Sequence, residues 1–226
     1  MVCGVSVVAT NLAYLVSACA GQVAVCVPYL AGCTSISRAA RQLPAVYLFR
    51  ATLIPVAPVM AAAWWLAGEW LDAGRGREAA ARRWIVALGV AGALCLVLYA
   101  TFLGTSGAAY ELMRRYGVTL YFAFTALAQM ILTACLGRRR RTGRPLAHIG
   151  SERFMTALAA VMLALGLTNI PLSNFMDADA LENAIEWNFA LAMMLWFGVL
   201  AREWRREGLV VRVYGPARSR PDGKET

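Results

Sequence analysis

Three polar stretches of the sequence, residues 32–44, 104–116 and 173–183, carry most of the residue types that are able to bind a charged ligand. Arginine suits a phosphate because its planar guanidinium binds two oxygens at once. Together with the helix starts beside them, these stretches supply candidates for a lipid head-group site or for a cap over the helix ends. The candidates are Ser35, Ser37, Arg38, Arg41, Pro44, Arg50, Glu111, Arg115, Glu186 and Trp187.

The charges in these stretches allow two compatible interpretations. Glu111, Glu186 and the acids of residues 173–183 would pair with the arginines and lock the loops into a cap, or the arginines would hold a lipid phosphate. Glu186 opens the last apolar block, where the helix dipole stabilises an acid. It is also a candidate partner for Arg50 or a polar contact for a substrate.

The sequence assigns no catalytic residue. The one histidine, His148, lies in a basic connector, and a hydrolytic metal site needs several histidine or carboxylate ligands. We therefore expect no metal and no cofactor. A lipid- or lipid-anchor-remodelling enzyme remains an alternative, with Glu186 or Glu111 as base and Ser35 as nucleophile, although a carboxylate is a weak base for serine unless its pKa is raised.

A small-molecule or lipid transporter is a further alternative. Ionisable residues in the middle of a membrane span typically mark proton pathways, and no acid lies near the middle of any apolar block.

The composition predicts an all-α, polytopic membrane protein. Of the 226 residues, 60% are hydrophobic and 15% charged, against about 45–50% and about 25% in a soluble domain. The excess falls in six blocks, each near or above the roughly 17–25 residues that cross a bilayer as a helix. We predict a transmembrane domain over residues 1–204 and a basic, disordered tail over 205–226. The predicted spans are about 5–30, 46–71, 84–103, 117–136, 154–172 and 184–200.

Basic residues are distributed unevenly between the two sides. The connectors 72–83 and 137–153 and the tail 202–226 carry four, six and seven of the 22 basic residues, and the other three loops with their helix starts carry the remaining five. The positive-inside rule therefore predicts cytoplasmic termini. The candidate residues then face the outside or a lumen.

This flanking arginine also explains the net charge of +9, so we do not expect a nucleic-acid partner. Four clustered basic residues beside a membrane gain about 1 kcal/mol each near an anionic surface. The run Arg138, Arg139, Arg140 and Arg141 is thus either an anionic-phospholipid site or a plain topology signal.

Three further features concern local contacts. Cys26 and Cys33 lie near the outer end of the first block, where the sequence leaves open whether they form a disulfide. Gln129 in the fourth block predicts a hydrogen bond between helices. Glu69, at the inner end of the second block, is expected to reach interfacial water or to pair with an arginine.

Three different segments of the chain carry short motifs. Pro28-Tyr29, Ser35-Ile36-Ser37, Pro44 and Phe49-Arg50 follow one another around the first polar stretch, Gly117 and Phe122 open the fourth block, and Glu186-Trp187 opens the last. These segments resemble the family that groups the DRAM autophagy modulators with the Frag and Sfk proteins. Two positions depart from that pattern, because Ala45 stands where many members carry glutamate and Arg115 where many carry histidine.

The resemblance implies a six-helix membrane protein whose function concerns lipid at the extracytoplasmic or lumenal face. Members of the family are linked to autophagy, to remodelling of lipid anchors, and to phosphoinositide kinase recruitment and phospholipid distribution. We expect a non-catalytic, lipid-associated regulator or scaffold. It would lie in the inner membrane of a bacterium, or in an endomembrane or the plasma membrane of a eukaryote.

Overall fold

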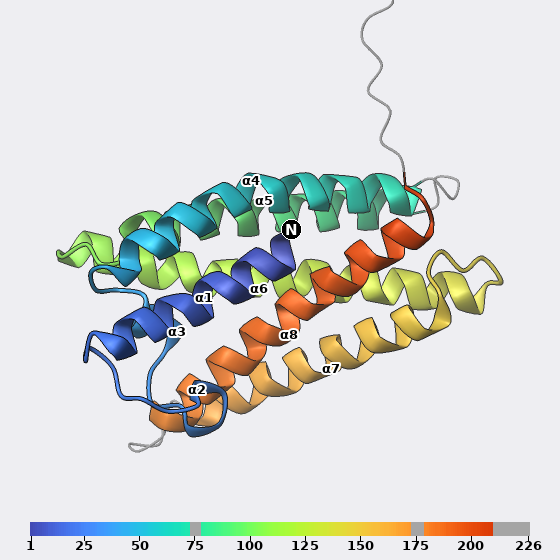
Figure 1. Ribbon diagram of the computed structural model, residues 1–226. Helices are drawn as coiled ribbons and strands as arrows, with labels where there is room; N and C mark the ends of the chain where they lie inside the picture. Colours follow the sequence, from blue (N-terminus) through green and yellow to red (C-terminus); the bar gives the residue numbers. More distant parts are fainter. Residues whose placement is uncertain (73–77, 173–178, 210–226) are drawn as a thin grey trace, which may run out of the picture.

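The computed structural model describes residues 1–72, 78–172 and 179–209, and helices are the only regular secondary structure within those ranges (Figure 1). The helices are α1 (Val2–Cys19), α2 (Pro28–Ala31), α3 (Ile36–Ala39), α4 (Ala45–Asp72), α5 (Ala79–Phe102), α6 (Ala108–Arg141), α7 (Ile149–Leu172) and α8 (Asp179–Arg206). In the described part, six of them (α1 and α4 to α8) are long and apolar enough to cross a membrane. The chain is therefore an all-helical, multi-pass integral membrane protein.

The long helices form a bundle with two distinct ends. Neighbours along the chain pack together, α4 on α5, α5 on α6 and α7 on α8, while α1 lies against α4 and α8. We call one end the cap end; it holds residues 20–44, the turn 103–107 and the start of α8. The other is the basic end, with residues 138–153 and 201–209. The charge count predicts that the cap end faces away from the cytoplasm.

Small residues let α5 approach its neighbours closely. A Cβ atom on Gly89 would lie 2.1 Å from the Trp64 ring of α4, and one on Gly92 would lie 2.7 Å from the Thr125 hydroxyl of α6. Gly117 of α6 lies against the α5 backbone, where a Cβ would be 3.0 Å from the Tyr99 nitrogen. Such close approach supplies the dispersion energy that holds helices together in lipid.

The interior combines aromatic packing with a few hydrogen bonds between helices. Trp64 and Trp196 stack with their ring centroids 5.9 Å apart, and the Trp196 indole N–H donates to the Thr133 hydroxyl at 3.0 Å. The Gln129 amide donates to the Met193 carbonyl at 3.0 Å, which confirms the predicted contact between helices.

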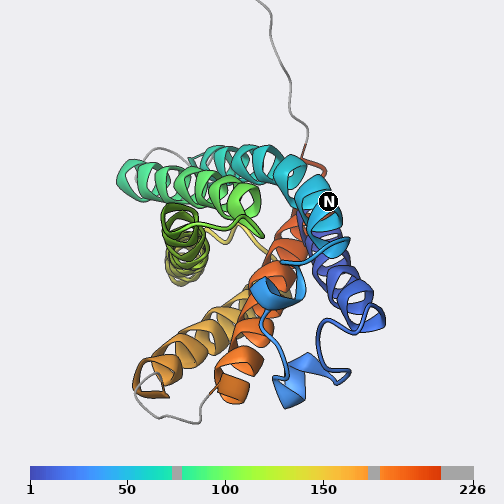
Figure 2. The same cartoon turned by 90° about the vertical axis from the view of Figure 1, so that its left-hand side faces the viewer.

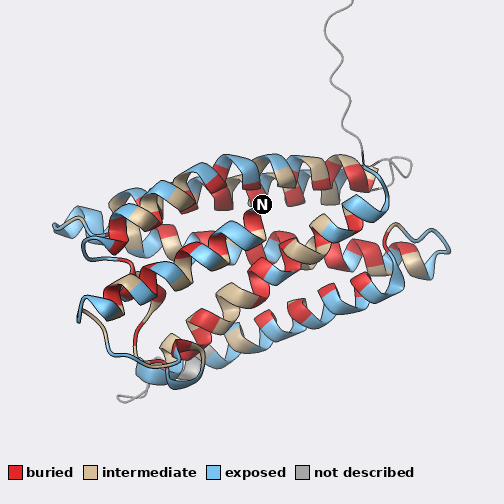
Figure 3. Ribbon diagram, viewed as in Figure 1, coloured by how far each residue is buried: buried red, intermediate tan, exposed pale blue. Residues whose placement is uncertain are grey.

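Large apolar side chains lie exposed on the outward faces of the bundle (Figure 3). They include Val8, Leu94, Val161, Leu163 and Leu167. A surface of this kind suits contact with lipid tails rather than with water.

The predicted first span, residues 5–30, was wrong at its far end, because α1 stops at Cys19. Gly21 adopts a left-handed conformation, with φ 69°, and the Gln22 amide donates to the Leu43 carbonyl at 2.6 Å. These contacts turn the chain out of the helix. The apolar residues Val25 and Val27 then lie exposed in the loop.

The predicted loops 104–116 and 173–183 were too long. Helix α6 begins at Ala108 and α8 at Asp179, so Glu111, Asp179 and Glu182 occupy first helical turns, where the helix dipole favours acids. The second, third and fifth predicted spans fall within α4, α5 and α7, apart from a single residue at the end of α5. Asp177 and residues 210–226 of the predicted tail lie outside the described residues.

Salt bridges join the helices at the basic end. Arg82 of α5 pairs with Glu69 and Asp72 of α4, which confirms an arginine partner for Glu69. Arg139 of α6 pairs with Glu78 at 3.2 Å and also donates to a carbonyl of α4. Both side chains of this last pair are nearly buried, so the pair bridges three segments away from water.

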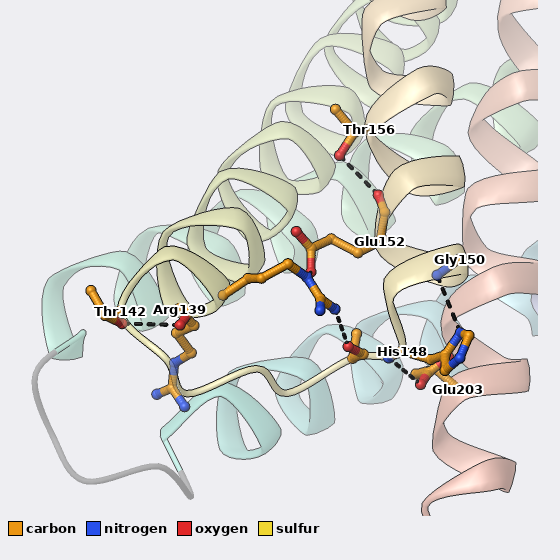
Figure 4. A network of polar contacts seen from close by, with 9 residues as sticks. Arg139, Thr142, His148, Gly150, Glu152, Thr156 and Glu203 are labelled. Atoms are coloured by element: carbon orange, nitrogen blue, oxygen red, sulfur yellow. Dashed lines mark hydrogen bonds and ion pairs between the residues drawn. The ribbon is translucent and has the colours of Figure 1, made fainter.

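The link from α6 to α7 and α8 also lies at the basic end (Figure 4). Arg140 pairs with Glu152 of α7 at 2.5 Å and donates to the Ala147 carbonyl at 2.6 Å. The backbone N–H of His148 donates to Glu203 of α8 at 2.8 Å. Two of the four clustered arginines are thus occupied by structural contacts, whereas Arg138 and Arg141 stay exposed.

Candidate functional site

The loop of residues 20–44 is anchored to α1 by polar side chains. The Tyr14 hydroxyl accepts from the Cys26 backbone N–H at 2.8 Å. Ser17, which is fully buried, donates to the Ala39 carbonyl at 2.5 Å. A disulfide joins Cys26 to Cys33, which settles the pairing that the sequence left open.

Three side chains of α8 hold the other side of this loop. Asn183 donates to the Gly32 carbonyl at 2.9 Å, Trp187 to the Thr34 carbonyl at 2.8 Å and Asn188 to the Tyr29 carbonyl at 2.8 Å. The spacing of these three residues places them at the start of one helix within little more than one turn. Trp187 was among the candidates from the sequence, but both asparagines were missed, although Asn188 directly follows Trp187 and Asn183 lies one helical turn before it.

Gly32 brings the loop into direct contact with α8. Its φ is 54°, and a Cβ atom there would lie 1.6 Å from the Ala180 carbonyl oxygen. The buried Trp187 ring completes the contact with edge-to-face packing on Tyr14 and Tyr29, at centroid distances of 6.0 and 5.2 Å. The cap therefore depends on hydrogen bonds and aromatic packing.

The predicted pairing of outer arginines with acids does not occur among the described residues, whose four salt bridges all lie at the basic end. Arg50 donates to the Leu103 carbonyl at 2.5 Å and to the Thr105 hydroxyl at 3.2 Å, so it braces the turn after α5 instead of pairing with Glu186. Both hydrogen bonds come from one terminal nitrogen of the guanidinium, whereas its buried Nε has no partner among the described residues.

A cluster of arginines gathers at the cap end. Partial burial, with the nearby charges of Arg114 and Arg38, lowers the pKa of Arg41, and Glu111 compensates only in part. The side chains of Arg38 and Arg41 remain exposed. An incoming anion would relieve this mutual repulsion.

Pro44 and Arg115 flank the same region. Pro44 is exposed, follows a cis peptide bond from Leu43 and immediately precedes α4. Arg115 is exposed on α6, one turn before Thr119.

Glu186 and Ser37 bring α8, α3 and α5 together. The Glu186 carboxylate faces the backbone N–H groups of Ile36 and Ser37. The Ser37 hydroxyl lies 2.9 Å from the Tyr99 hydroxyl. The side chain of Ser35 accepts the Arg38 backbone N–H at 3.1 Å and so caps α3. Tyr99 is a member of this cluster that sequence reasoning missed, since nothing distinguishes it within an apolar block.

Two hollows meet at Glu186. A narrow chamber of about 40 Å³ lies within the bundle, with a lining that includes Tyr99, Leu96, Met193 and Trp187. The second hollow, which we call the lateral cleft, opens between α6 and the α7–α8 pair and has a volume of about 750 Å³. Both hollows are lined by Val118, Phe122 and Glu186.

The lateral cleft exists because α6 and α7 diverge toward the cap end. Figure 2 views that end and shows the α7–α8 pair spread away from α6. The two sides meet at the basic end, where Arg140 pairs with Glu152. The cleft is lined by the polar residues Ser35, Ser37 and Glu182 near the cap end. The apolar residues Val118, Phe122 and Phe189 line the part that lies further toward the basic end.

The described residues contain no group of three histidine, cysteine or acidic side chains placed to hold a metal ion. His148 lies at the basic end, where its ring accepts the Gly150 N–H at 3.2 Å. Comparisons with protein families, curated proteins and solved structures found no match for this chain.

Proposed function

We propose that this chain is a non-catalytic, lipid-associated membrane protein that holds a lipid of the cap-end leaflet in the lateral cleft and acts as a regulator or scaffold. The observation that carries the proposal is the lateral cleft itself, which has apolar walls, a polar upper rim and a junction with the inner chamber at Glu186. A lipid matches this arrangement, because its acyl chain is apolar and its head group is polar. The resemblance to the DRAM, Frag and Sfk proteins is consistent with this proposal.

The cleft opens sideways, in the direction from which a lipid arrives. Its walls come from α6, α7 and α8, which are all candidate membrane spans. The Phe122 and Phe189 rings pack edge to face, with their centroids 5.6 Å apart, and close the inner side of the cleft. An acyl chain that lies along these two rings stays in apolar surroundings. Each buried methylene contributes about 0.8 kcal/mol relative to water, but little relative to bilayer, so the polar rim must supply the selectivity.

Filling the cleft tests the proposal. Gly166 lines it, and a Cβ atom there has Phe189 as its nearest neighbour at 3.9 Å, so Gly166→Trp places an indole in the cleft. The matched control is Val161→Trp, an exposed position of α7 that does not line the cleft and that lies five residues away, on a different face of the helix. Native mass spectrometry of the purified protein should show fewer retained lipids for Gly166→Trp and no change for Val161→Trp. Equal lipid retention in both variants contradicts the proposal.

The alternative of a lipid-remodelling enzyme draws on the cluster of Ser37, Tyr99 and Glu186 at the junction. In this cluster the Ser37 hydroxyl contacts the Tyr99 hydroxyl, whereas the carboxylate faces backbone N–H groups. A serine nucleophile needs a base on its own hydroxyl, so this arrangement favours binding. Turnover of a phospholipid or lipid-anchored peptide by the purified protein, lost in Ser37→Ala, would favour the enzyme instead.

A further inference from the structure

The two walls of the lateral cleft carry opposite charges at its mouth. On α6, the Thr119 hydroxyl donates to the Arg115 carbonyl at 2.9 Å. Thr119 lines the cleft. Residues four apart lie on one face of a helix, so Arg115 lies one turn above Thr119, toward the cap end. On α8, Glu182 and Glu186 line the opposite wall, also one turn apart.

These charges have no ion-pair partner among the described residues, because the four salt bridges found there use other side chains. Asn183 of the α8 wall is engaged, since its amide donates to the Gly32 carbonyl. The α8 wall therefore offers two carboxylates as hydrogen-bond acceptors, and the Ser35 and Ser37 hydroxyls at the start of α3 lie in the same cleft.

Tyr99 lies close both to the acidic side of the cleft and to the arginines of the cap end. Its hydroxyl contacts Ser37 and lies within electrostatic reach of Glu186, Arg41 and Arg114. Positive charge and negative charge thus flank the junction of chamber and cleft. A head group that carries charge of one sign only would be repelled either by the arginines or by the carboxylates.

We infer that the lipid in the lateral cleft is a zwitterionic phospholipid with a primary-amine head group, whose phosphate lies toward Arg115 and whose ammonium lies against Glu182 and Glu186. The inference rests on the proposed function, because it names the lipid class for the same cleft. The ammonium of an ethanolamine head group carries three N–H donors, as a lysine does. Carboxylates and serine hydroxyls are the acceptors such donors need.

Two other head groups fit less well. A quaternary choline has no N–H to donate, so the carboxylates would lose solvent without gaining hydrogen bonds. A phosphatidylglycerol head group keeps its negative charge beside two carboxylates, and juxtaposed like charges cost several kcal/mol. The α8 wall therefore selects for the primary amine, while the α6 wall accepts any phosphate.

The experiment uses the full purified chain and three phospholipids with identical acyl chains, bearing ethanolamine, choline or glycerol head groups. Native mass spectrometry with equimolar lipids measures the share of each lipid bound. Hydrogen bonds to charged groups are stronger than those between neutral groups, so wild type should favour the ethanolamine lipid about tenfold or more. Glu186→Gln should abolish most of that preference. Arg115→Gln should weaken the binding of all three lipids by a similar factor.

An exposed arginine of the basic end, changed by Arg153→Gln, is the control and should leave the selectivity intact. A thermal unfolding midpoint within a few degrees of wild type verifies that each variant is folded. Preference for the glycerol lipid, or an unchanged ethanolamine preference in Glu186→Gln, overturns the inference and leaves the lipid cleft standing. Absence of any retained lipid in wild type overturns the proposed function as well.

Discussion

The two ends of the bundle use their charges in opposite ways. At the basic end, arginines pair with acids of neighbouring helices and tie α4, α5, α6 and α7 together. At the cap end, loop carbonyls, asparagines and tryptophan provide the contacts. Paired charges fix the helices at one end. At the other end, the charges that have no salt-bridge partner within residues 1–72, 78–172 and 179–209 remain available to a ligand, and the helices diverge there to form the lateral cleft.

The largest expected effect comes from breaking the buried pair of the basic end. Arg139→Ala leaves the Glu78 carboxylate and the Leu71 carbonyl without their partner, and loss of one member of a buried pair costs about 3–5 kcal/mol. The midpoint of thermal unfolding in detergent micelles should fall strongly. Arg138→Ala, at an exposed neighbour, should stay within about 0.5 kcal/mol of wild type. Equal losses in both variants would show that the pair contributes nothing.

The next largest effect is expected at the contact of the loop with α8. Gly32→Ala combines a left-handed conformation with a collision against the Ala180 carbonyl, and we expect a loss of about 3 kcal/mol. Gly21→Ala is the matched control, since its φ is also positive but its Cβ meets nothing within 4 Å. It should lose only about 1 kcal/mol through strain. If chemical unfolding gives the same loss for both, the loop does not depend on this contact.

A smaller effect is expected from the hydrogen bond at the start of α8. Trp187→Phe keeps a ring against Tyr14 and Tyr29 but leaves the buried Thr34 carbonyl without its donor. We expect a loss of about 1.5 kcal/mol. Trp65→Phe makes the same change at a half-exposed ring and should be nearly neutral in the same unfolding assay. A neutral Trp187→Phe would remove this bond from the account of the cap.

The smallest effect is expected at the exposed pairs of the basic end. Arg82→Gln removes contacts whose side chains are 36% and 42% exposed in the pair with Glu69, and such pairs contribute about 0.2–1 kcal/mol. Salt should shrink the difference from wild type, because it screens exposed charges. A loss that is large, or that high salt does not reduce, would mean that this pair behaves like the buried one.

The sequence predicted two of the helices well. The limits of the second and third spans agree with α4 and α5 within about five residues. The fourth span also has charged flanks, but α6 continues past Arg114 and Arg115 and begins at Ala108. The first span failed because residues 20–27 are as apolar as a membrane helix. What removes them from α1 is a left-handed Gly21, the Tyr14 contacts and a disulfide, which hydropathy does not register.

The candidate site was predictable in its residue types but not in its pairings. Trp187 and Ser37 were selected and do form cap contacts, and Glu186 lies at the junction of the hollows. The sequence suggested an Arg50 partner for Glu186, yet Arg50 braces the turn after α5. The lateral cleft could not be predicted, because it arises from the divergence of α6 and α7, which depends on three-dimensional packing.

The most direct test of the central claim is to map where a lipid touches the protein. A phosphatidylethanolamine with a photoreactive diazirine in its acyl chain would be cross-linked to the purified chain, and the labelled peptides sequenced. The account predicts labelling concentrated on residues 118–123 of α6 and 185–190 of α8, and its loss in Gly166→Trp. Labelling spread evenly over the outward faces of α5 and α7, unchanged by Gly166→Trp, would contradict it.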